Sequence, residues 1–416
     1  MNLANKKVTI IGARRSGIAA ANLVSQMGGR VKISDQASYD SIRTDLERLK
    51  NPQDVKVEWG RHTVEFIEDS DLIVLSPGVP RNARPIRWAK AQKIPVLGEI
   101  ELAWRFCSKP VVAVTGTNGK TTVATLIAQI LEKAGRRPCL CGNVGTPFSE
   151  HALDSEDKDV VVLEVSSFQL ESIVDFRPHV AVFLNFSQNH LDRHRDLEEY
   201  WEAKKRIFLN QKPQDYALLN ADCPRMRGLA AHLKVKVIYF NGDDPRAKNP
   251  NQLAALAVAR ILGVDEEIAL KVFREFKGVE HRLEWVRCVA GVHFINDSKA
   301  TTAEASRWAI QNFERPIVMI CGGRDKNIDF SVLRDLVKAR VKKMLVIGEA
   351  RDKIRGTFAD VVALEECPSL LEAVRKSQKS AQRGEYVVFS PMCASFDMFS
   401  NFEERGKIFK KIVQEL

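Results

Sequence analysis

The sequence predicts an α/β protein made of three domains in series, at residues 1–108, 109–278 and 279–416. The first strand expected in the third domain is VHFIND (292–297). Short runs of β-branched residues alternate with stretches of helical periodicity along the whole chain, which is the pattern of parallel strands joined by crossover helices. The length of 416 residues also corresponds to about three domains of ordinary size, and no internal repeat or low-complexity linker interrupts the alternation.

The first domain is expected to be Rossmann-like. The strand KKVTIIG leads into the glycine turn GARRSG (12–17), a helix around Ile18–Met27 and a second strand that Asp35 closes. This order is that of a dinucleotide fingerprint, in which the aspartate holds a ribose hydroxyl. Arg14 replaces the central glycine, however, and hinders close approach of a pyrophosphate. We therefore expect a nucleotide-type ligand that binds by another route, and an NAD-dependent oxidoreductase is disfavoured.

The second domain opens on a candidate phosphate loop, VVAVTGTNGKTT (111–122), which predicts a P-loop-type mononucleotide-binding domain. The usual pattern has a glycine five residues before Gly119, and Val114 stands there. Gly116 and Gly119 still free the backbone to wrap a phosphate, while Lys120 can reach the β- and γ-phosphates and Thr121 can ligate Mg²⁺. A plain turn between strand and helix has no use for Lys-Thr-Thr, so a nucleotide cradle is favoured.

Polar residues after the next strands are candidates for the remaining magnesium ligands, which should be oxygen donors. Glu164 ends the strand VVVLEVS, and His190 and Asp192 follow the strand VAVFLN. A single histidine can equally be a core or surface residue. The density of polar residues at the carboxyl end of one strand favours a functional role.

Composition and charge argue against a nucleic-acid-binding protein, a membrane-spanning protein and a protein built around zinc or disulfides. The net charge of +10 comes from lysines and arginines spread along the chain, and aromatic residues make up 7%, so a basic surface for small anionic substrates is favoured over a nucleic-acid interface. No apolar run reaches the roughly 18 residues of a membrane span. The 8 cysteines form no C-x-x-C pair, which disfavours a zinc site or disulfide framework and fits a reducing cytoplasm.

Seven motifs, in the second and third expected domains, resemble those of the Mur ligase family, and in particular those of the members that add D-glutamate. The phosphate loop is shared with sister ligases and with folylpolyglutamate synthetase, whereas the SSFQLE segment and the last motif are far narrower. The motifs are GTNGKTT (116–122), LEVSSFQLE (163–171), NHLDRH (189–194), HRLE (281–284), INDSKATT (295–302), CGGRDK (321–326) and SPMCASFDMFSNFEERG (390–406).

The resemblance implies a cytoplasmic, ATP-dependent ligase of peptidoglycan synthesis, and through it of cell-wall biogenesis, cell shape and cell division. ATP would convert the free carboxylate of UDP-N-acetylmuramoyl-L-alanine into an acyl phosphate, which the amine of D-glutamate attacks. The three domains would bind, in order, the UDP substrate, ATP with two Mg²⁺ ions, and ATP with D-glutamate. A monomer without nucleic-acid or membrane partners is expected. A non-catalytic binding protein of the same descent is disfavoured, because Lys120, Glu164, His190 and Lys204 are all present.

The resemblance also assigns residues to roles. The implied catalytic residues are Lys120, Glu164, His190 and Lys204, and the implied metal ligands are Thr121, Glu164, His190 and Lys204. The implied ATP-binding residues are Gly116, Thr117, Asn118, Gly119, Lys120, Thr121, Thr122, Asn251, Arg282 and Asp297. The implied substrate-binding residues are Asp35, Ser76, Pro77 and Gly78 for UDP, Asn143 and Ser166 for the muramoyl part, and Lys299, Thr301, Lys326, Ser395 and Phe402 in the third domain.

Lys204 has a special place in this assignment. Helical spacing puts it on one face with Tyr200 and Phe208, so it should follow the apolar face rather than the solvated Lys205. Its stem could pack while its ammonium reaches water. An ammonium beside two magnesium ions would be repelled, however, and the resemblance implies a lysine carbamylated by carbon dioxide. We therefore expect a carbamylated Lys204.

Three positions depart from the family pattern. Asn189 stands where an aspartate usually precedes the metal-binding histidine, which removes a negative charge. Asn327 replaces a glycine, and asparagine tolerates the positive φ such a turn requires. An asparagine pair usually contacts the adenine region. Asn251 fits one member, while Asn249 is displaced by one residue from the other.

Overall fold

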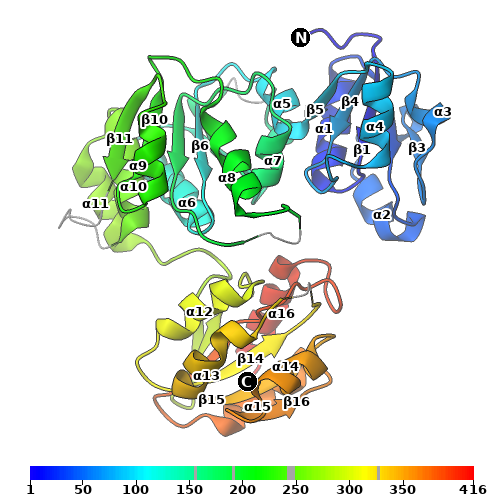
Figure 1. Ribbon diagram of the computed structural model, residues 1–416. Helices are drawn as coiled ribbons and strands as arrows, with labels where there is room; N and C mark the ends of the chain where they lie inside the picture. The colour runs from blue at the N-terminus through cyan, green and yellow to red at the C-terminus, as the bar shows by residue number, and fades with distance from the viewer. Residues whose placement is uncertain (154–156, 190–192, 241–248, 326–327) are drawn as a thin grey trace. The chain divides into compact units, whose positions relative to one another are not determined.

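The computed structural model describes residues 1–153, 157–189, 193–240, 249–325 and 328–416, so His190, Asp192, Lys326 and Asn327 lie outside the described ranges. Three sheets follow one another along the chain (Figure 1), which confirms the predicted α/β class. The residues group into two compact units, Met1–Phe276 and Lys277–Leu416. Among the described residues, no helix has the length and apolar character that crossing a membrane requires.

The first sheet has the strand order β3-β2-β1-β4-β5, and each pair is parallel. Its strands are β1 (Lys7–Ile11), β2 (Arg30–Ser34), β3 (Lys56–Glu58), β4 (Leu72–Leu75) and β5 (Val96–Gly98), and its helices are α1 (Arg15–Gln26), α2 (Tyr39–Leu46), α3 (Val64–Ile67), α4 (Arg84–Ala91) and α5 (Glu99–Trp104). Because β1, β2 and β4 are parallel, the loops after them lie at the same end of the sheet, where ligands bind in such folds.

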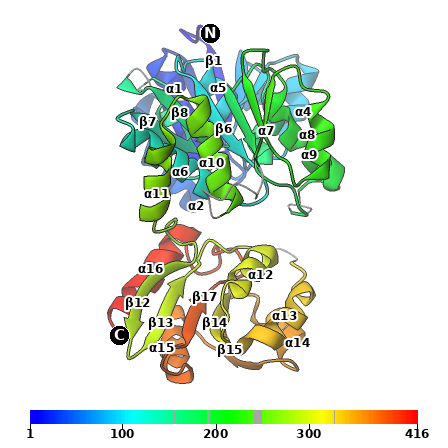
Figure 2. The ribbon, with the colours of Figure 1, turned by 90° about the vertical axis from the view of Figure 1, so that its left-hand side faces the viewer.

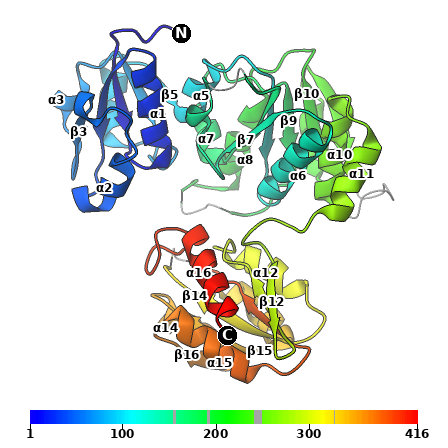
Figure 3. The same cartoon turned by 180° about the vertical axis from the view of Figure 1, so that it is seen from behind.

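The second sheet has the order β11-β10-β9-β6-β8-β7 and is also parallel throughout. Its strands are β6 (Val111–Thr115), β7 (Pro138–Gly142), β8 (Val160–Glu164), β9 (Val180–Phe183), β10 (Tyr216–Asn220) and β11 (Lys236–Phe240), and its helices are α6 (Lys120–Lys133), α7 (Ser167–Glu171), α8 (Leu197–Lys205), α9 (Pro224–Ala230), α10 (Pro250–Ile261) and α11 (Glu266–Glu275). Helices α6, α10 and α11 pack together over one face (Figure 3), and every residue of β6 is buried, as expected for a strand covered on both faces.

Two buried carboxylates on α5 attach the first sheet to the second domain. Glu101 is 0% exposed, and its Oε2 accepts hydrogen bonds from the backbone N–H groups of Val174, Asp175 and Phe176 at 2.8, 3.0 and 2.8 Å. Glu99 Oε1 accepts another from the N–H of Ser149 at 2.7 Å. Buried polar groups are almost always hydrogen-bonded in native proteins, and these contacts help to explain why both sheets belong to one compact unit.

The second unit holds a sheet of order β12-β13-β17-β14-β15-β16 (Figure 2), in which only the β12–β13 pair is antiparallel. Its strands are β12 (Glu284–Val289), β13 (Val292–Asn296), β14 (Ile317–Gly322), β15 (Val341–Ile347), β16 (Ala363–Glu366) and β17 (Tyr386–Phe389), and its helices are α12 (Ala303–Gln311), α13 (Arg334–Arg340), α14 (Arg351–Phe358), α15 (Leu370–Ser380) and α16 (Phe402–Gln414). The sequence predicted that this sheet begins at VHFIND, which is β13. It missed β12, an edge strand that is largely exposed.

Candidate active site

The glycine turn after β6 has the geometry of a phosphate loop. Gly116 and Gly119 have φ angles of 153° and 84°, the left-handed region that glycine adopts most easily. Val114 lies inside β6, paired with Val182 and Glu164, so the turn starts only at Gly116 and a glycine at position 114 is not needed. A Cβ on Gly119 would lie 2.4 Å from Oδ1 of Asn251, which places that predicted adenine-side residue directly against the loop.

The loop is braced from the end of β9. The Asn185 side chain accepts from the N–H of Asn118 at 2.8 Å and donates to the Asn118 carbonyl at 3.0 Å. The N–H of Thr117 donates to the Asn185 carbonyl at 3.0 Å. Sequence reasoning missed Asn185, although a polar residue directly after a buried strand is the same signal that singled out Glu164.

Lys120 stands where α6 begins, with Thr121 and Thr122 in the same first turn. Its ammonium donates to the carbonyl groups of Gly116 and Thr117, each at 2.9 Å, and so lies over the loop. The helix N-terminus, the loop N–H groups and this cation together create positive potential at one point, which suits a phosphate group.

Two side chains converge on Glu164, the last residue of β8: Thr121 from the first turn of α6, and Asn143 from the loop after β7. The Thr121 hydroxyl donates to Oε2 at 2.7 Å, and the Asn143 amide donates to Oε1 at 2.8 Å. Glu164 is 2% exposed. A hydroxyl and a carboxylate are hard oxygen donors, so the donor set fits Mg²⁺.

Lys204 lies in the last turn of α8 and is 1% exposed, whereas the side chain of Lys205 is 38% exposed. The predicted orientation of Lys204 is therefore confirmed. Its Nζ donates to the Gly116 carbonyl at 2.8 Å and lies 4.8 Å from the centre of the Tyr200 ring. Burial, and secondly the charge of Lys120, lower the pKa of Lys204 well below its ordinary value, while Glu164 acts in the opposite direction.

The SSFQ segment begins α7, and its first serine is a helix cap. Ser166 accepts from the N–H of Gln169 at 3.3 Å, and the Gln169 side chain accepts from the N–H of Ser166 at 3.0 Å. This capping box gives Ser166 and Gln169 a structural role, which is to stabilise the start of α7. Next to it, the Arg193 guanidinium lies 4.1 Å from the Phe168 ring centre and donates to the Gly78 carbonyl at 3.2 Å.

Arg193 thus connects the central domain to the Ser76-Pro77-Gly78 turn of the first sheet. Sequence reasoning singled out its neighbours but missed this role.

The residues expected at the UDP end come together at one edge of the first sheet. Asp35 accepts from the N–H of Ala13 at 2.6 Å, which ties it to the glycine turn. A Cβ on Gly12 would lie 2.8 Å from that of Ser76, so the turns after β1 and β4 are in contact. Arg14 extends away from the turn and pairs with Asp45 of α2 at 3.2 Å.

A pocket at the ends of β2 and β3 adds basic side chains that sequence reasoning missed. Its lining residues are Gln36, Gly60, Arg61, His62 and Arg84.

Asn249 and Asn251 have different positions. Asn249 is the N-cap of α10, and its Oδ1 accepts from the N–H groups of Asn251 and Gln252 at 3.0 and 3.1 Å. The side chain of Asn249 therefore caps the helix, while Asn251 contacts the phosphate loop at Gly119.

In the second unit, Asp297 follows β13 and is buried. It accepts from the Ser390 hydroxyl at 2.7 Å and from the N–H of Leu283 at 3.2 Å. Burial is the main reason that the pKa of Asp297 is raised to about 7, and the nearby Arg282 partly opposes this shift. The Lys299 ammonium lies 5.5 Å from the centre of the Phe402 ring.

Thr301 and Ser395, which are also expected at the site in this unit, lie on loops at the same end of the sheet. The N–H of Thr301 donates to the Lys299 carbonyl at 2.9 Å. Ser395 is buried, and its neighbour Ala394 accepts from the N–H of Arg324, after β14, at 2.9 Å. Arg324 is two residues before Lys326, which lies outside the described ranges.

Comparison with known proteins identifies related sequences for all three parts of the chain. Residues 6–98 match the MurD-like N-terminal domain of Mur ligases, residues 114–285 the Mur ligase middle domain, and residues 281–393 the Mur ligase glutamate ligase domain. The UDP-N-acetylmuramoylalanine–D-glutamate ligase of Thermoanaerobacter sp. (strain X514) is 39% identical over 453 residues, covering 100% of both chains. That of Alkaliphilus metalliredigens (strain QYMF) is 40% identical over 456 residues, covering 100% of this chain and 99% of the relative.

Solved structures show the same fold at lower identity. The UDP-N-acetylmuramate–alanine ligase MurC of Thermotoga maritima has a TM-score of 0.61 at 18% identity, covering 99% of this chain and 100% of that chain. The MurF ligase of Thermotoga maritima in complex with ADP has a TM-score of 0.61 at 17% identity, covering 84% and 91%.

Proposed function

The chain belongs to the Mur ligase family, and on that premise we propose that it joins D-glutamate to UDP-N-acetylmuramoyl-L-alanine at the expense of ATP, in cytoplasmic peptidoglycan precursor synthesis. Relatives with that name match it over its full length at 39 and 40% identity. The structural observation that carries the proposal is the convergence of Lys120, Thr121, Glu164 and Lys204 on one phosphate loop.

The reaction follows from the weakness of a carboxylate as an acyl donor. Transfer of the γ-phosphoryl group to the substrate carboxylate gives an acyl phosphate and ADP. The neutral amine of D-glutamate then attacks the acyl carbon, and the tetrahedral intermediate expels phosphate, loses the amine proton and leaves the amide. Lys120 and the N–H groups of the loop hold the phosphates and meet the charge that develops on the transferring group.

Magnesium would be held by Thr121, Glu164, His190 and a modified Lys204. His190 lies outside the described ranges and is proposed from the sequence alone. Two ions would neutralise charge on the phosphate oxygens. The hydroxyl and carboxylate that meet at Glu164 support this assignment.

Carbamylation of Lys204 is the part of this proposal that the lysine's surroundings support best. The neutral amine adds to carbon dioxide, forms an N–C bond and releases one proton, and so becomes a carboxylate. Burial and Lys120 lower the pKa of Lys204, which increases the fraction of neutral amine. The product would place a negative group beside Lys120 and the metal ions, where the unmodified ammonium would repel both.

The remaining substrate groups are assigned by domain, with 1–108, 109–278 and 279–416 as the proposed boundaries. Asp35 and the Ser76–Gly78 turn, beside the basic pocket, would hold UDP, and Asn143 and Ser166 the muramoyl part. Outside the phosphate loop, the residues proposed to contact ATP are Asn251, Arg282 and Asp297. Lys299, Thr301, Lys326, Ser395 and Phe402 are the proposed residues for D-glutamate. We propose a monomer that acts on small molecules alone, without nucleic-acid or membrane partners.

Phosphate release from ATP tests the proposal. Release should require UDP-N-acetylmuramoyl-L-alanine and D-glutamate together with Mg²⁺, and mass spectrometry should show one amide product. L-glutamate serves as the matched control and should support little release. Nucleotide binding without phosphate release would instead identify a non-catalytic binding protein.

A further inference from the structure

Arg282 lies between two residues with left-handed backbone conformations. The φ angles of His281 and Leu283 are 64° and 43°. Neither residue is a glycine, and a bulky residue such as leucine rarely adopts this region. Such backbone strain persists only where the surroundings hold it in place, and it concentrates at functional sites.

Three hydrogen bonds hold the backbone on both sides of this arginine. The N–H of His281 donates to Oε2 of Glu284 at 2.9 Å, and the His281 carbonyl accepts from the N–H of Lys299 at 3.0 Å. The N–H of Leu283 donates to Oδ1 of Asp297 at 3.2 Å. The two flanking peptides are therefore tied to residues proposed to act on ATP and D-glutamate.

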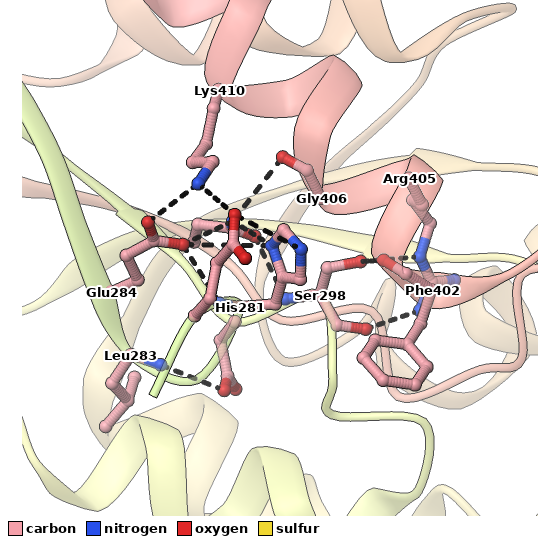
Figure 4. A network of polar contacts seen from close by, with 11 residues as sticks. His281, Leu283, Glu284, Ser298, Phe402, Arg405, Gly406 and Lys410 are labelled. Atoms are coloured by element: carbon pink, nitrogen blue, oxygen red, sulfur yellow. Dashed lines mark hydrogen bonds and ion pairs between the residues drawn. The ribbon is translucent and has the colours of Figure 1, made fainter. Parts of the chain in front are cut away.

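The imidazole of His281 fills a site shaped for it (Figure 4). It is 2% exposed and meets the Phe402 ring edge-on, with 6.4 Å between ring centres. A Cβ on Gly406 would lie 2.3 Å from Nδ1, so glycine is required there to admit the ring. Gly406 is thus a helical position at which any side chain would displace the histidine.

The hydrogen bonds around the ring define its protonation. Asn296 Nδ2 lies 2.9 Å from His281 Nδ1 and also donates to Oε2 of Glu284 at 3.0 Å. The carboxylate can only accept, which orients the amide so that Nδ1 accepts its hydrogen bond. Nε2 therefore carries the hydrogen of the ring, and burial lowers the pKa of His281, although the charges of Glu280 and Glu284 oppose this shift.

Lys410 completes the network and argues against a metal ion here. Glu280, His281 and Glu284 could in principle ligate a cation. The Lys410 ammonium, however, donates to Oε1 of Glu280 at 2.6 Å. It also donates to Oε1 of Glu284 at 2.9 Å (Figure 4). This cation orients Glu284, which in turn holds the N–H of His281.

We propose that His281, seated against Gly406, is a positioning residue that holds the strained backbone around Arg282 and so aims that arginine at the nucleotide. The inference rests on the function proposed above, in which Arg282 contacts ATP. His281 touches no substrate in this role and acts only through its neighbour.

A matched pair of glycine substitutions tests this role. Gly406→Ala puts a methyl group against the imidazole, while Gly356→Ala in α14 adds one where nothing lies within 4 Å. Both replace a helical glycine of the same unit, so the gain in helix propensity is similar. Gly406→Ala should lower kcat/KM for ATP between about 10- and 100-fold, as expected for a misplaced group, while Gly356→Ala stays at the wild-type value.

A double-mutant cycle separates positioning from general structural damage. In an Arg282→Ala background, Gly406→Ala should change kcat/KM for ATP by less than about twofold, because the residue it acts through is gone. The same cycle measured as Kd for a non-hydrolysable ATP analogue, by calorimetry on the full chain, should give the same non-additivity. Purely structural damage would cause an equal loss in both backgrounds.

The outcomes distinguish this inference from the proposed function. Equal activity of the two glycine variants, full additivity in the cycle, or an Arg282→Ala variant with unchanged affinity for the analogue would each overturn it. Failure of the wild type to ligate D-glutamate would instead refute the proposed function. The double-mutant cycle measured as Kd for the ATP analogue would still test the role of His281 in that case. If Gly406→Ala does not fold, His281→Asn replaces it in the cycle, since asparagine tolerates left-handed backbone.

Discussion

The buried amine of Lys204 donates a 2.8 Å hydrogen bond to the carbonyl oxygen of Gly116, the first glycine of the phosphate loop. This contact joins the last turn of α8 to the loop after β6, two segments that are far apart in the sequence. It also places the amine of Lys204 near the charge of Lys120 and out of contact with water. Burial and this neighbouring charge both lower the pKa of Lys204, which favours the neutral amine.

The first prediction concerns carbamylation of Lys204. Lys204→Ala should lose nearly all ligase activity, whereas Lys205→Ala, which changes the exposed neighbour, should keep it. Wild-type activity should fall when carbon dioxide is removed and return with bicarbonate. A carbamate resonance should appear in ¹³C NMR after incubation with labelled bicarbonate, and it should be absent from Lys204→Ala. Full activity of that variant in carbon-dioxide-depleted buffer would refute the modification.

Lys120→Ala should abolish turnover and leave the fold intact. The variant keeps the N–H groups of the loop but lacks the cation that follows the γ-phosphoryl, so kcat should fall at least about 100-fold. Lys133→Ala, in the last turn of the same helix, removes only an exposed ion pair with Glu275 and serves as the control. Phosphate release and thermal melting measure the two effects, and a Lys120→Ala enzyme with wild-type kcat would contradict the assignment.

The stability of the first unit should depend on the ionisation of Glu99. Burial raises the pKa of this carboxyl to about 7. Between the unfolded value of about 4.3 and this folded value, the folded state holds a proton that the unfolded state has lost, so the free energy of unfolding falls as pH rises. The loss should approach about 3 kcal/mol by pH 7.

Urea unfolding of wild type and Glu99→Gln between pH 4.5 and 7.5 checks this dependence. The difference between the two proteins should grow in favour of the variant as pH rises, since the neutral amide does not titrate. Glu132→Gln, at an exposed position in α6, should follow the wild type. A pH-independent difference between wild type and Glu99→Gln would show that the carboxyl is ionised throughout.

Substitution of Asn249 should affect mainly the stability of the protein, whereas substitution of Asn251 should affect mainly its affinity for the nucleotide. Asn249→Ala removes the N-cap of α10 and should lower the free energy of unfolding by about 1 kcal/mol. Asn251→Ala removes the side chain that contacts Gly119 and should weaken binding of an ATP analogue with little change in stability. Calorimetry and urea unfolding of both variants test this prediction. Weaker binding of the analogue by Asn249→Ala, together with a lower free energy of unfolding for Asn251→Ala, would contradict it.

The elements that the sequence predicted well are buried strands followed by helices with clear periodicity. Strands β1, β6, β8 and β9 are short apolar runs that end at glycine or polar residues, so the residues of each strand are enough to predict it. Strand β12 was missed because it is an edge strand, with exposed residues at alternate positions. Its pairing with β13, rather than its own composition, makes it a strand.

The sequence by itself determined the α/β class, the order of strand, glycine turn and helix at 111–133, and the place of Glu164 at the end of a buried strand, because each depends on residues close together in the chain. Only the tertiary structure decided which distant groups meet. Glu101 accepts hydrogen bonds from N–H groups more than 70 residues away, and Arg193 reaches the carbonyl of Gly78, 115 residues before it. The physical reason is that local pattern sets which backbone conformation a segment prefers, whereas the partners of a buried charge are set by how the sheets pack.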